Sequence, residues 1–119
     1  MRHLSSLIKE TSVSDGNVAI FFLGQAGLVI KTSRGTLIAV DLYLSDCVEH
    51  FDGYKRLMPK LLDPKDLIFD FIVTTHRHYD HFDPDSVPIL MSNDTSILLA
   101  ATDCEYECRS RGISPERTN

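Results

Sequence analysis

Four side chains that could bind metal ions lie within six residues of this sequence: His76, His78, Asp80 and His81. His76 and His78 are two residues apart, so in an extended or turning segment their imidazoles can point the same way and share one ion. Asp80 and His81 are adjacent and can turn toward a second ion. Imidazole suits zinc, manganese or iron, and a carboxylate adds an oxygen ligand that harder ions favour. The spacing predicts a site where two ions, about 3.5–4 Å apart, hold a hydroxide and polarise a carbonyl or phosphoryl oxygen.

A structural role is the alternative for these histidines. A single loop histidine is usually solvated or has a satisfied hydrogen bond. Three imidazoles and a carboxylate this close together are hard to explain by packing, because protonated imidazoles repel each other and fill no core volume. We therefore favour the metal site. The remaining histidines, His3 and His50, lie in polar surroundings without ligand partners nearby in sequence, and we expect them to be solvated.

The elements around the histidines are typical of an α/β fold. Phe69 to Thr75 is mostly apolar and predicts a strand buried on both faces. Pro84 to Met91 can form a short helix that Asp83 would cap. The histidine segment would then lie at the carboxyl end of a strand, where ligands and catalytic groups collect in α/β sheets. Thr95 to Ala101 predicts another strand, and Asp103 to Arg111 a helix.

The first half of the chain predicts antiparallel strands over residues 17–45. The apolar runs are Val18 to Leu23, Leu28 to Thr32 and Thr36 to Tyr43. Gly24-Gln25-Ala26-Gly27 and Ser33-Arg34-Gly35 separate them, and we expect the first to be a tight turn rather than a phosphate loop. Residues 1–16 form a polar lead-in. Residues 44–68 are irregular, with a short helical turn at residues 64–67 capped by Asp63.

Two stretches resemble a known family. The segment from Thr75 to His81 is similar to the HxHxDH loop of the metallo-β-lactamase superfamily. Upstream, LGQAG (Leu23 to Gly27) and IAVDLYLSD (Ile38 to Asp46) resemble the opening hairpin of the branch that contains L-ascorbate 6-phosphate lactonase. The resemblance implies the metallo-β-lactamase fold, an αββα sandwich. Residues 1–119 would be its incomplete amino-terminal half, with a strand, metal loop, helix, strand and helix over residues 69–112.

The resemblance also implies a role for each site residue. His76 and His78 would bind the first metal, and Asp80 and His81 the second. Asp80 would also orient the nucleophilic hydroxide. Asp41 would lie behind the ligands and brace the histidine loop, although the residues alone would equally allow a turn residue at the end of a strand. The superfamily completes its site with later residues, and no histidine follows His81 here.

The activity implied by the resemblance is metal-dependent hydrolysis of a lactone or another ester-like bond in a small molecule, such as a phosphorylated sugar lactone. We expect the chain to be truncated and inactive alone. The alternatives are a non-catalytic fragment or partner-dependent subunit, and a small metal-binding module that uses only this loop. An open sheet edge and uncovered apolar residues such as Phe71, Ile97 and Leu99 predict self-association into a homo-oligomer.

Composition excludes several other classes. The net charge is −5, and the basic residues are scattered, so we expect no nucleic-acid partner. No apolar run approaches the roughly 20 residues that span a bilayer, and no secretory signal is predicted. The cysteines Cys47, Cys104 and Cys108 are an odd number, which favours reduced thiols in the cytoplasm. We interpret them as small buried hydrophobes rather than zinc ligands.

Overall fold

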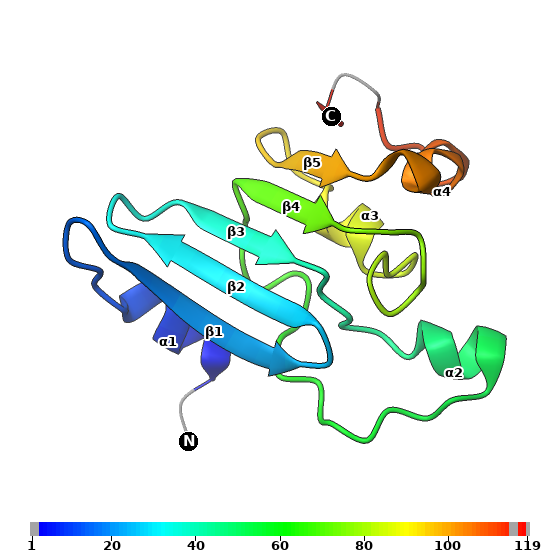
Figure 1. The fold of residues 1–119 in the computed structure, drawn as a ribbon, viewed down its shortest axis with the longest axis horizontal. Helices are drawn as coiled ribbons and strands as arrows, with labels where there is room; N and C mark the ends of the chain where they lie inside the picture. Colours follow the sequence, from blue (N-terminus) through cyan, green and yellow to red (C-terminus); the bar gives the residue numbers. More distant parts are fainter. Residues whose placement is uncertain (1–2, 115–116, 119) are drawn as a thin grey trace.

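The computed structural model describes residues 3–114 and 117–118. Three consecutive strands follow the first helix, and from α2 onward short helices and strands alternate (Figure 1). The helical elements are α1 (Leu4–Glu10), α2 (Cys47–Asp52), α3 (Val87–Leu90), the 3-10 turn η1 (Thr102–Cys104) and α4 (Glu105–Ser110). The strands are β1 (Val18–Gly24), β2 (Gly27–Thr32), β3 (Leu37–Val40), β4 (Phe71–Thr74) and β5 (Ile97–Ala100).

The strands form one sheet in the order β1-β2-β3-β4-β5 (Figure 1). β1, β2 and β3 are antiparallel neighbours. β4 runs parallel to β3, and β5 runs parallel to β4. The predicted α/β class is confirmed, and so is the antiparallel opening.

The turn between β1 and β2 depends on backbone conformations that favour glycine. Gly24 has φ +89° and Gln25 has φ +53°, and Gly24 pairs with Gly27 across the turn. A side chain at Gly24 would also meet the Met58 side chain, which lies 3.2 Å from the position of a Cβ atom there. The tight turn predicted for GQAG is therefore confirmed.

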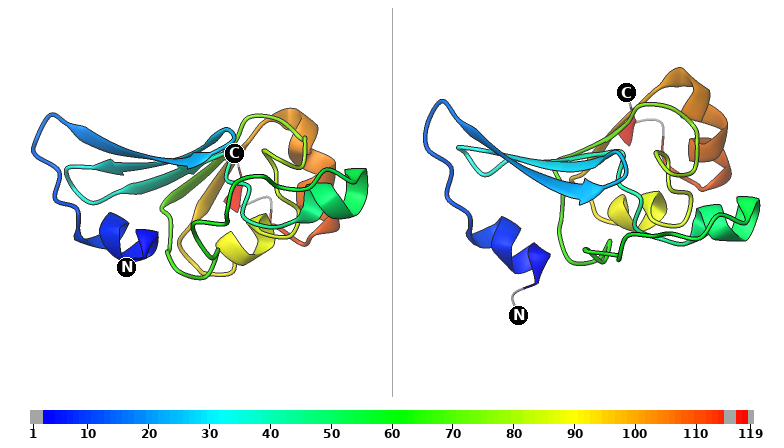
Figure 2. Two further views of the ribbon diagram at one scale, coloured as in Figure 1. Left: turned by 90° about the horizontal axis from the view of Figure 1, so that it is seen from below. Right: turned by 60° about the horizontal axis from the view of Figure 1, so that its bottom comes forward.

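The hydrophobic core lies on one face of the sheet. Figure 2 shows α1 (blue) and α3 (yellow) on the same side of the strands. A row of paired residues crosses all five strands on this covered face: Phe21, Val29, Ala39, Ile72 and Leu98. Phe69, Phe82 and Val87 complete the core from the connecting segments.

The other face of the sheet is not covered by the described residues. In β4, Ile72 and Thr74 are buried, but Phe71 and Val73 are only half-buried. The expectation that β4 is buried on both faces is therefore wrong. An apolar run indicates two covered faces only if layers pack on both sides, and here the helices lie on one side.

Helix α1 was not predicted, because residues 1–16 look polar in sequence. Ile8 on this helix is fully buried in the core. The Lys31 ammonium of β2 donates hydrogen bonds to the carbonyl oxygens of Ile8 and Lys9, at 2.8 and 2.9 Å. A cation at the carboxyl end of a helix satisfies carbonyls that have no partner within the helix. Leu4 also packs against the core, so two apolar side chains and one lysine hold α1 against the sheet.

Other elements are shorter than predicted. The helix expected over Pro84 to Met91 is regular only at Val87–Leu90. Residues 64–67 form a turn rather than a helix, in which the Asp63 carboxylate accepts a hydrogen bond from Lys65 N at 2.8 Å. Within residues 3–114 and 117–118, no helix has both the length and the apolar character needed to cross a bilayer.

Candidate functional site

The histidine loop leaves the sheet at the carboxyl end of β4 and leads into α3 (the yellow-green segment in Figure 1). β3 is the parallel neighbour of β4, so both strands end at the same edge. Val40 pairs with Val73 in the last register position of β3, and Asp41 N donates to Val73 O at 2.9 Å. Parallel pairing therefore brings Asp41 beside Thr75, although 34 residues separate them in sequence.

Asp41 is buried, and its carboxylate is fully engaged with the histidine loop. Oδ1 accepts a hydrogen bond from Thr75 N at 2.8 Å. Oδ2 accepts one from Thr75 Oγ1 at 2.7 Å and lies 3.0 Å from His81 Nδ1. Asp41 has φ +48°, in the left-handed region that aspartate tolerates better than most residues. This conformation ends β3 and turns the carboxylate toward the loop.

These contacts assign the tautomers of two neutral histidines. A carboxylate only accepts, so His81 Nδ1 donates to Asp41. The Thr75 hydroxyl has one proton, which it donates to Asp41, so at 3.0 Å from His76 Nδ1 it accepts the proton of that ring nitrogen. In both rings the lone pair is then on Nε2. A partner that fixes the far nitrogen is a common arrangement behind metal-binding histidines.

The three imidazoles of the loop lie close together. The ring centroid of His76 is 4.0 Å from that of His81 and 4.7 Å from that of His78. Hydrogen bonds from the backbone N–H groups of His81 and Phe82 to His78 O, at 2.8 and 2.7 Å, close a helical turn. This turn brings His81 back toward His76, so the loop gathers the rings in one cluster rather than in two separate pairs.

Asp80 completes the predicted ligand set at the edge of this cluster. Its Oδ2 atom lies 3.6 Å from His81 Nε2, and its side chain is 40% exposed. Within residues 3–114 and 117–118, however, no three His, Cys, Asp or Glu side chains converge closely enough to hold an ion together. The four residues are brought into one loop, and the division of ligands between two ions stays a prediction.

Asp83 was predicted only as a helix cap, and the structure gives it a larger role. Its side chain is completely buried. Oδ1 accepts hydrogen bonds from Asp85 N and Ser86 N, at 3.0 and 3.2 Å, so Asp83 closes the turn that precedes α3. The N-cap residue of α3 itself is Ser86 and not the predicted Asp83, because the regular helix begins only at Val87. The carboxylate also accepts from Leu44 N and Ser45 N, both at 2.9 Å, and from Ser45 Oγ at 2.7 Å. Asp83 thus joins the segment after Asp41 to the end of the histidine loop.

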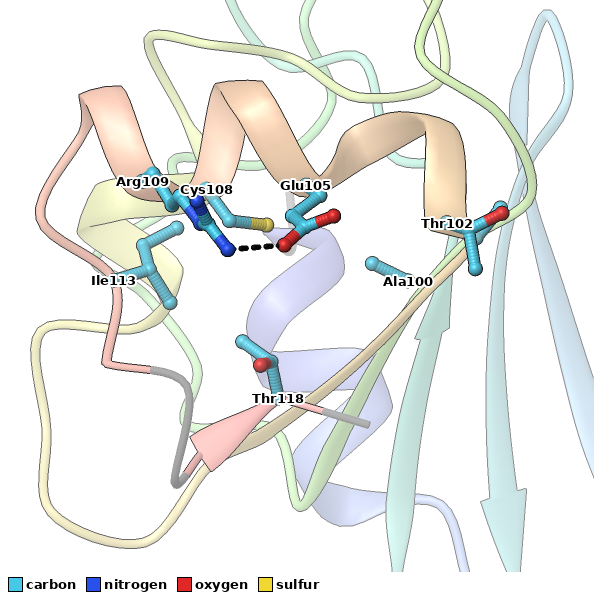
Figure 3. Close-up of a pocket in the computed structure, with 8 residues that line it drawn as sticks. Ala100, Thr102, Glu105, Cys108, Arg109, Ile113 and Thr118 are labelled. Atoms are coloured by element: carbon cyan, nitrogen blue, oxygen red, sulfur yellow. Dashed lines mark hydrogen bonds and ion pairs between the residues drawn. The ribbon is translucent and has the colours of Figure 1, made fainter.

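A hollow of about 450 Å³ opens beside this loop. His78 and Asp80 line it from the loop, and Tyr54 and Glu107 line it from either side. A second hollow, of about 300 Å³, lies between β5 and α4 (Figure 3). An ion pair between Glu105 and Arg109 borders it, and no residue of the histidine loop lines it. Of these two hollows, the first is lined by residues of the predicted ligand set, and of the three imidazoles it reaches that of His78.

The cysteines do not take part in this site. All three are buried. Burial raises the pKa of the Cys47 thiol to about 12 and that of Cys104 to about 11, and it also raises the pKa of Cys108. A thiol that stays protonated is a poor metal ligand and a poor nucleophile. Their interpretation as buried hydrophobes is confirmed.

Comparison with known proteins gives distant relatives. No family model matches the sequence. The chain is 25% identical over 111 residues to the protein named "Probable L-ascorbate-6-phosphate lactonase UlaG" of Shigella boydii serotype 4. It is 27% identical over 111 residues to proteins of the same name from Escherichia coli O139:H28 and Salmonella paratyphi B. Each alignment covers 76% of this chain and 31% of the relative.

The chain thus spans about a third of the length of these relatives. Their names indicate a lactonase-like hydrolase, in agreement with the branch to which the sequence motifs point.

Proposed function

We propose that this chain carries part of the metal site of a metal-dependent hydrolase acting on a lactone or another ester-like bond. The observation that supports this most directly is the hydrogen-bond network of Asp41. One buried carboxylate, directly and through Thr75, fixes Nδ1 of His76 and of His81 and leaves the lone pair of each ring on Nε2. Metal-binding histidines commonly have such a partner on the ring nitrogen that does not bind the metal.

The nitrogen and oxygen donor atoms of the histidine loop suit a divalent metal ion. His76 and His81 would bind through Nε2, with His78 and Asp80 as further ligands, which suits zinc, manganese or iron. An open catalytic zinc site usually has about three protein ligands, so four residues would suffice for one ion and leave two ions incompletely bound. When bound, the metal would supply Lewis-acid chemistry that polarises the scissile carbonyl and lowers the pKa of water.

The chain's own side chains would prepare this chemistry. Asp41 holds two rings in place before any ligand arrives, and Asp83 keeps the Asp41 segment joined to the loop. Asp80 lies at the edge of the cluster, where it would orient the attacking water. The hollow beside His78 and Asp80 would give a small lactone access to these two residues.

The test is the metal content of the chain, measured by mass spectrometry after equilibration with zinc or manganese. We expect stoichiometric metal in the unmodified chain and at least a tenfold loss of affinity in His78→Ala. His50→Ala is the matched control, because His50 is an exposed histidine of helix α2 and should leave metal binding unchanged. Equal metal content in all three proteins, or none in the unmodified chain, would refute a metal site in this loop.

A second candidate function is that of a non-catalytic, partner-dependent subunit. The uncovered apolar face of the sheet favours this alternative. Hydrolysis of simple lactones by the metal-loaded chain tests whether the chain is sufficient for activity. Turnover that His78→Ala abolishes would support the hydrolase and count against the subunit, whereas metal binding without turnover is expected of a partial hydrolase site and of a subunit alike.

A further inference from the structure

A second carboxylate contacts the histidine loop, from the side opposite Asp41. Asp103 follows β5, which is the parallel neighbour of β4 on the side away from β3. Its Oδ2 atom accepts a hydrogen bond from Arg77 N at 3.3 Å. Arg77 lies between His76 and His78, so this contact is made within the predicted ligand set. Asp103 was not predicted as a site residue, because 26 residues separate it from Arg77 in sequence.

Parallel pairing brings Asp103 to the loop. Thr74 pairs with Ala100 in the last register position of β4 and β5, and Ala101 N donates to Thr74 O at 3.1 Å. A hydrogen bond from Cys104 N to Ala101 O, at 2.9 Å, then closes the 3-10 turn η1. This turn places Asp103 just beyond the end of β4, beside the start of the histidine loop.

The residue that follows Asp103 fixes its carboxylate. Cys104 is fully buried, and its thiol donates to Asp103 Oδ1, with the sulfur 3.6 Å from that oxygen. The sulfur also lies 3.7 Å from Thr74 Oγ1. The thiol has one proton, which it donates to the carboxylate, so the Thr74 hydroxyl donates to the sulfur. Burial raises the pKa of Cys104 to about 11, so the thiol keeps this proton at neutral pH.

We propose that Asp103 is a positioning residue for the histidine loop, an inference that rests on the proposed function. Asp41 accepts a hydrogen bond from Thr75 N, and Asp103 accepts one from Arg77 N. Two carboxylates from neighbouring strand ends therefore hold the backbone on either side of His76. Hydrogen-bonded partners behind metal ligands orient those ligands before the ion binds.

His78 is the predicted ligand that depends most on Asp103. The rings of His76 and His81 are fixed through Nδ1 by hydrogen bonds. The His78 ring has no such partner among the described residues, so its place is set mainly by the backbone. Asp103 holds that backbone at Arg77 N, directly before His78, and the turn to His81 holds it at His78 O.

A role in helix α4 is the alternative for Asp103. It lies in the turn that precedes α4, where a negative charge is favourable near the amino end of a helix. That role requires the charge, whereas the contact with Arg77 requires only an acceptor oxygen. Asp103→Asn separates the two roles, because it removes the charge and keeps an oxygen that can accept from Arg77 N.

The experiment measures zinc affinity, by competition with a chelating dye, in the unmodified chain and three variants. Asp103 is exposed, so its replacement should leave the fold intact. We expect Asp103→Ala to lower the affinity about tenfold, at the lower end of the loss for residues that position metal ligands. Asp103→Asn should stay within about threefold of the unmodified chain. Asp94→Ala is the matched control, because Asp94 is an exposed aspartate before β5 and should change nothing.

Amide NMR signals of the metal-free chain supply a second readout. In Asp103→Ala the Arg77 amide proton should move upfield, because it loses its carboxylate acceptor. The Thr75 amide proton should stay in place, because Asp41 still accepts from it. A helix role would instead move the amide signals of α4, leave Arg77 unchanged and make Asp103→Asn equal to Asp103→Ala.

Failure of this inference can be told from failure of the proposed function. If the unmodified chain binds zinc and Asp103→Ala binds it equally well, the inference alone is overturned. An Arg77 amide that does not move, or an equal loss of zinc affinity in Asp103→Asn, would also overturn it alone. No zinc binding by the unmodified chain would refute the proposed function, and the inference would fail with it.

Discussion

At the scale of single residues, Asp41 is the organising group of the candidate site. Its carboxylate receives the Thr75 amide, the Thr75 hydroxyl and His81 Nδ1. The sequence resemblance implied that Asp41 braces the loop, but it gave no role to Thr75. The structure makes Thr75 the link between Asp41 and His76, because its hydroxyl contacts both.

Thr75→Val should therefore change the His76 ring and leave the His81 ring unchanged. Valine has nearly the shape of threonine and removes the hydroxyl, so His76 loses the partner of Nδ1 while His81 keeps Asp41. In nitrogen-15 NMR of the metal-free chain at about pH 8, where histidine is neutral, we expect the His76 ring to become a mixture of tautomers. The His81 signals should stay as in the unmodified chain. An unchanged His76 ring would contradict the tautomer assignment.

The buried thiol of Cys47 should make the fold sensitive to alkali. Its pKa rises from the ordinary value of 9.0 to about 12 in the fold, mainly through burial. Above pH 9 the unfolded chain releases this proton and the folded chain does not, so the free energy of unfolding falls as pH rises. Urea unfolding at increasing pH from neutral should show this fall, with a shallower slope in Cys47→Ala. Equal slopes would show that the thiol does not contribute.

At the scale of elements, the site depends on two segments that follow parallel strands. β3 leads to Asp41 and then to Leu44 and Ser45, and β4 leads to the histidine loop. The sheet places the starts of the two segments side by side. Beyond the sheet, the buried Asp83 carboxylate accepts hydrogen bonds from backbone N–H groups of the segment after β3 and of the turn after the histidine loop, which joins the two segments again. Neither segment has regular structure of its own to hold it there.

Asp83→Ala should remove the hydrogen bonds that join these two segments. The change leaves five donors without their carboxylate acceptor, and hydrogen bonds to a charged group contribute about 1.5–3 kcal/mol each. We expect a loss of about 3 kcal/mol or more in the free energy of unfolding, with faster amide exchange at Leu44 and Ser45. Asp85→Ala, at an exposed neighbour, should change stability by less than about 0.5 kcal/mol. Similar effects of both substitutions would contradict the assigned role of Asp83.

At the scale of the whole molecule, the core is one-sided. Every fully buried strand residue lies on the face that the helices cover, whereas the opposite face is apolar and half-exposed. The stability of the described part of the chain therefore depends mainly on the covered face. A substitution on the covered face should destabilise the chain more than one on the opposite face.

Two neighbouring leucines of β5 allow a matched test. Leu98 is fully buried on the covered face, and Leu99 is half-buried on the opposite face. Leu98→Ala should cost about 2–5 kcal/mol in the free energy of unfolding, and Leu99→Ala less than about 1.5 kcal/mol. Urea unfolding at low micromolar concentration measures both costs. Equal costs would mean that the opposite face is covered in solution.

The sequence by itself determined the local features. Apolar runs and glycine turns indicated the first three strands, and the close spacing of His76, His78, Asp80 and His81 indicated one loop with metal-binding chemistry. Local spacing was sufficient because these residues are close together along the chain. Helix α1 escaped prediction because its place depends on contacts with β2, through Lys31, that no local pattern records.

Only the tertiary structure decided how distant residues meet. Asp41 reaches Thr75 and His81 because β3 and β4 pair in parallel, and Asp83 reaches Leu44 and Ser45 because both loops leave the same edge of the sheet. The tertiary structure also determined that β4 is buried on one face rather than on two. An apolar sequence determines that a strand can be buried, but the layers that pack against it determine which face is.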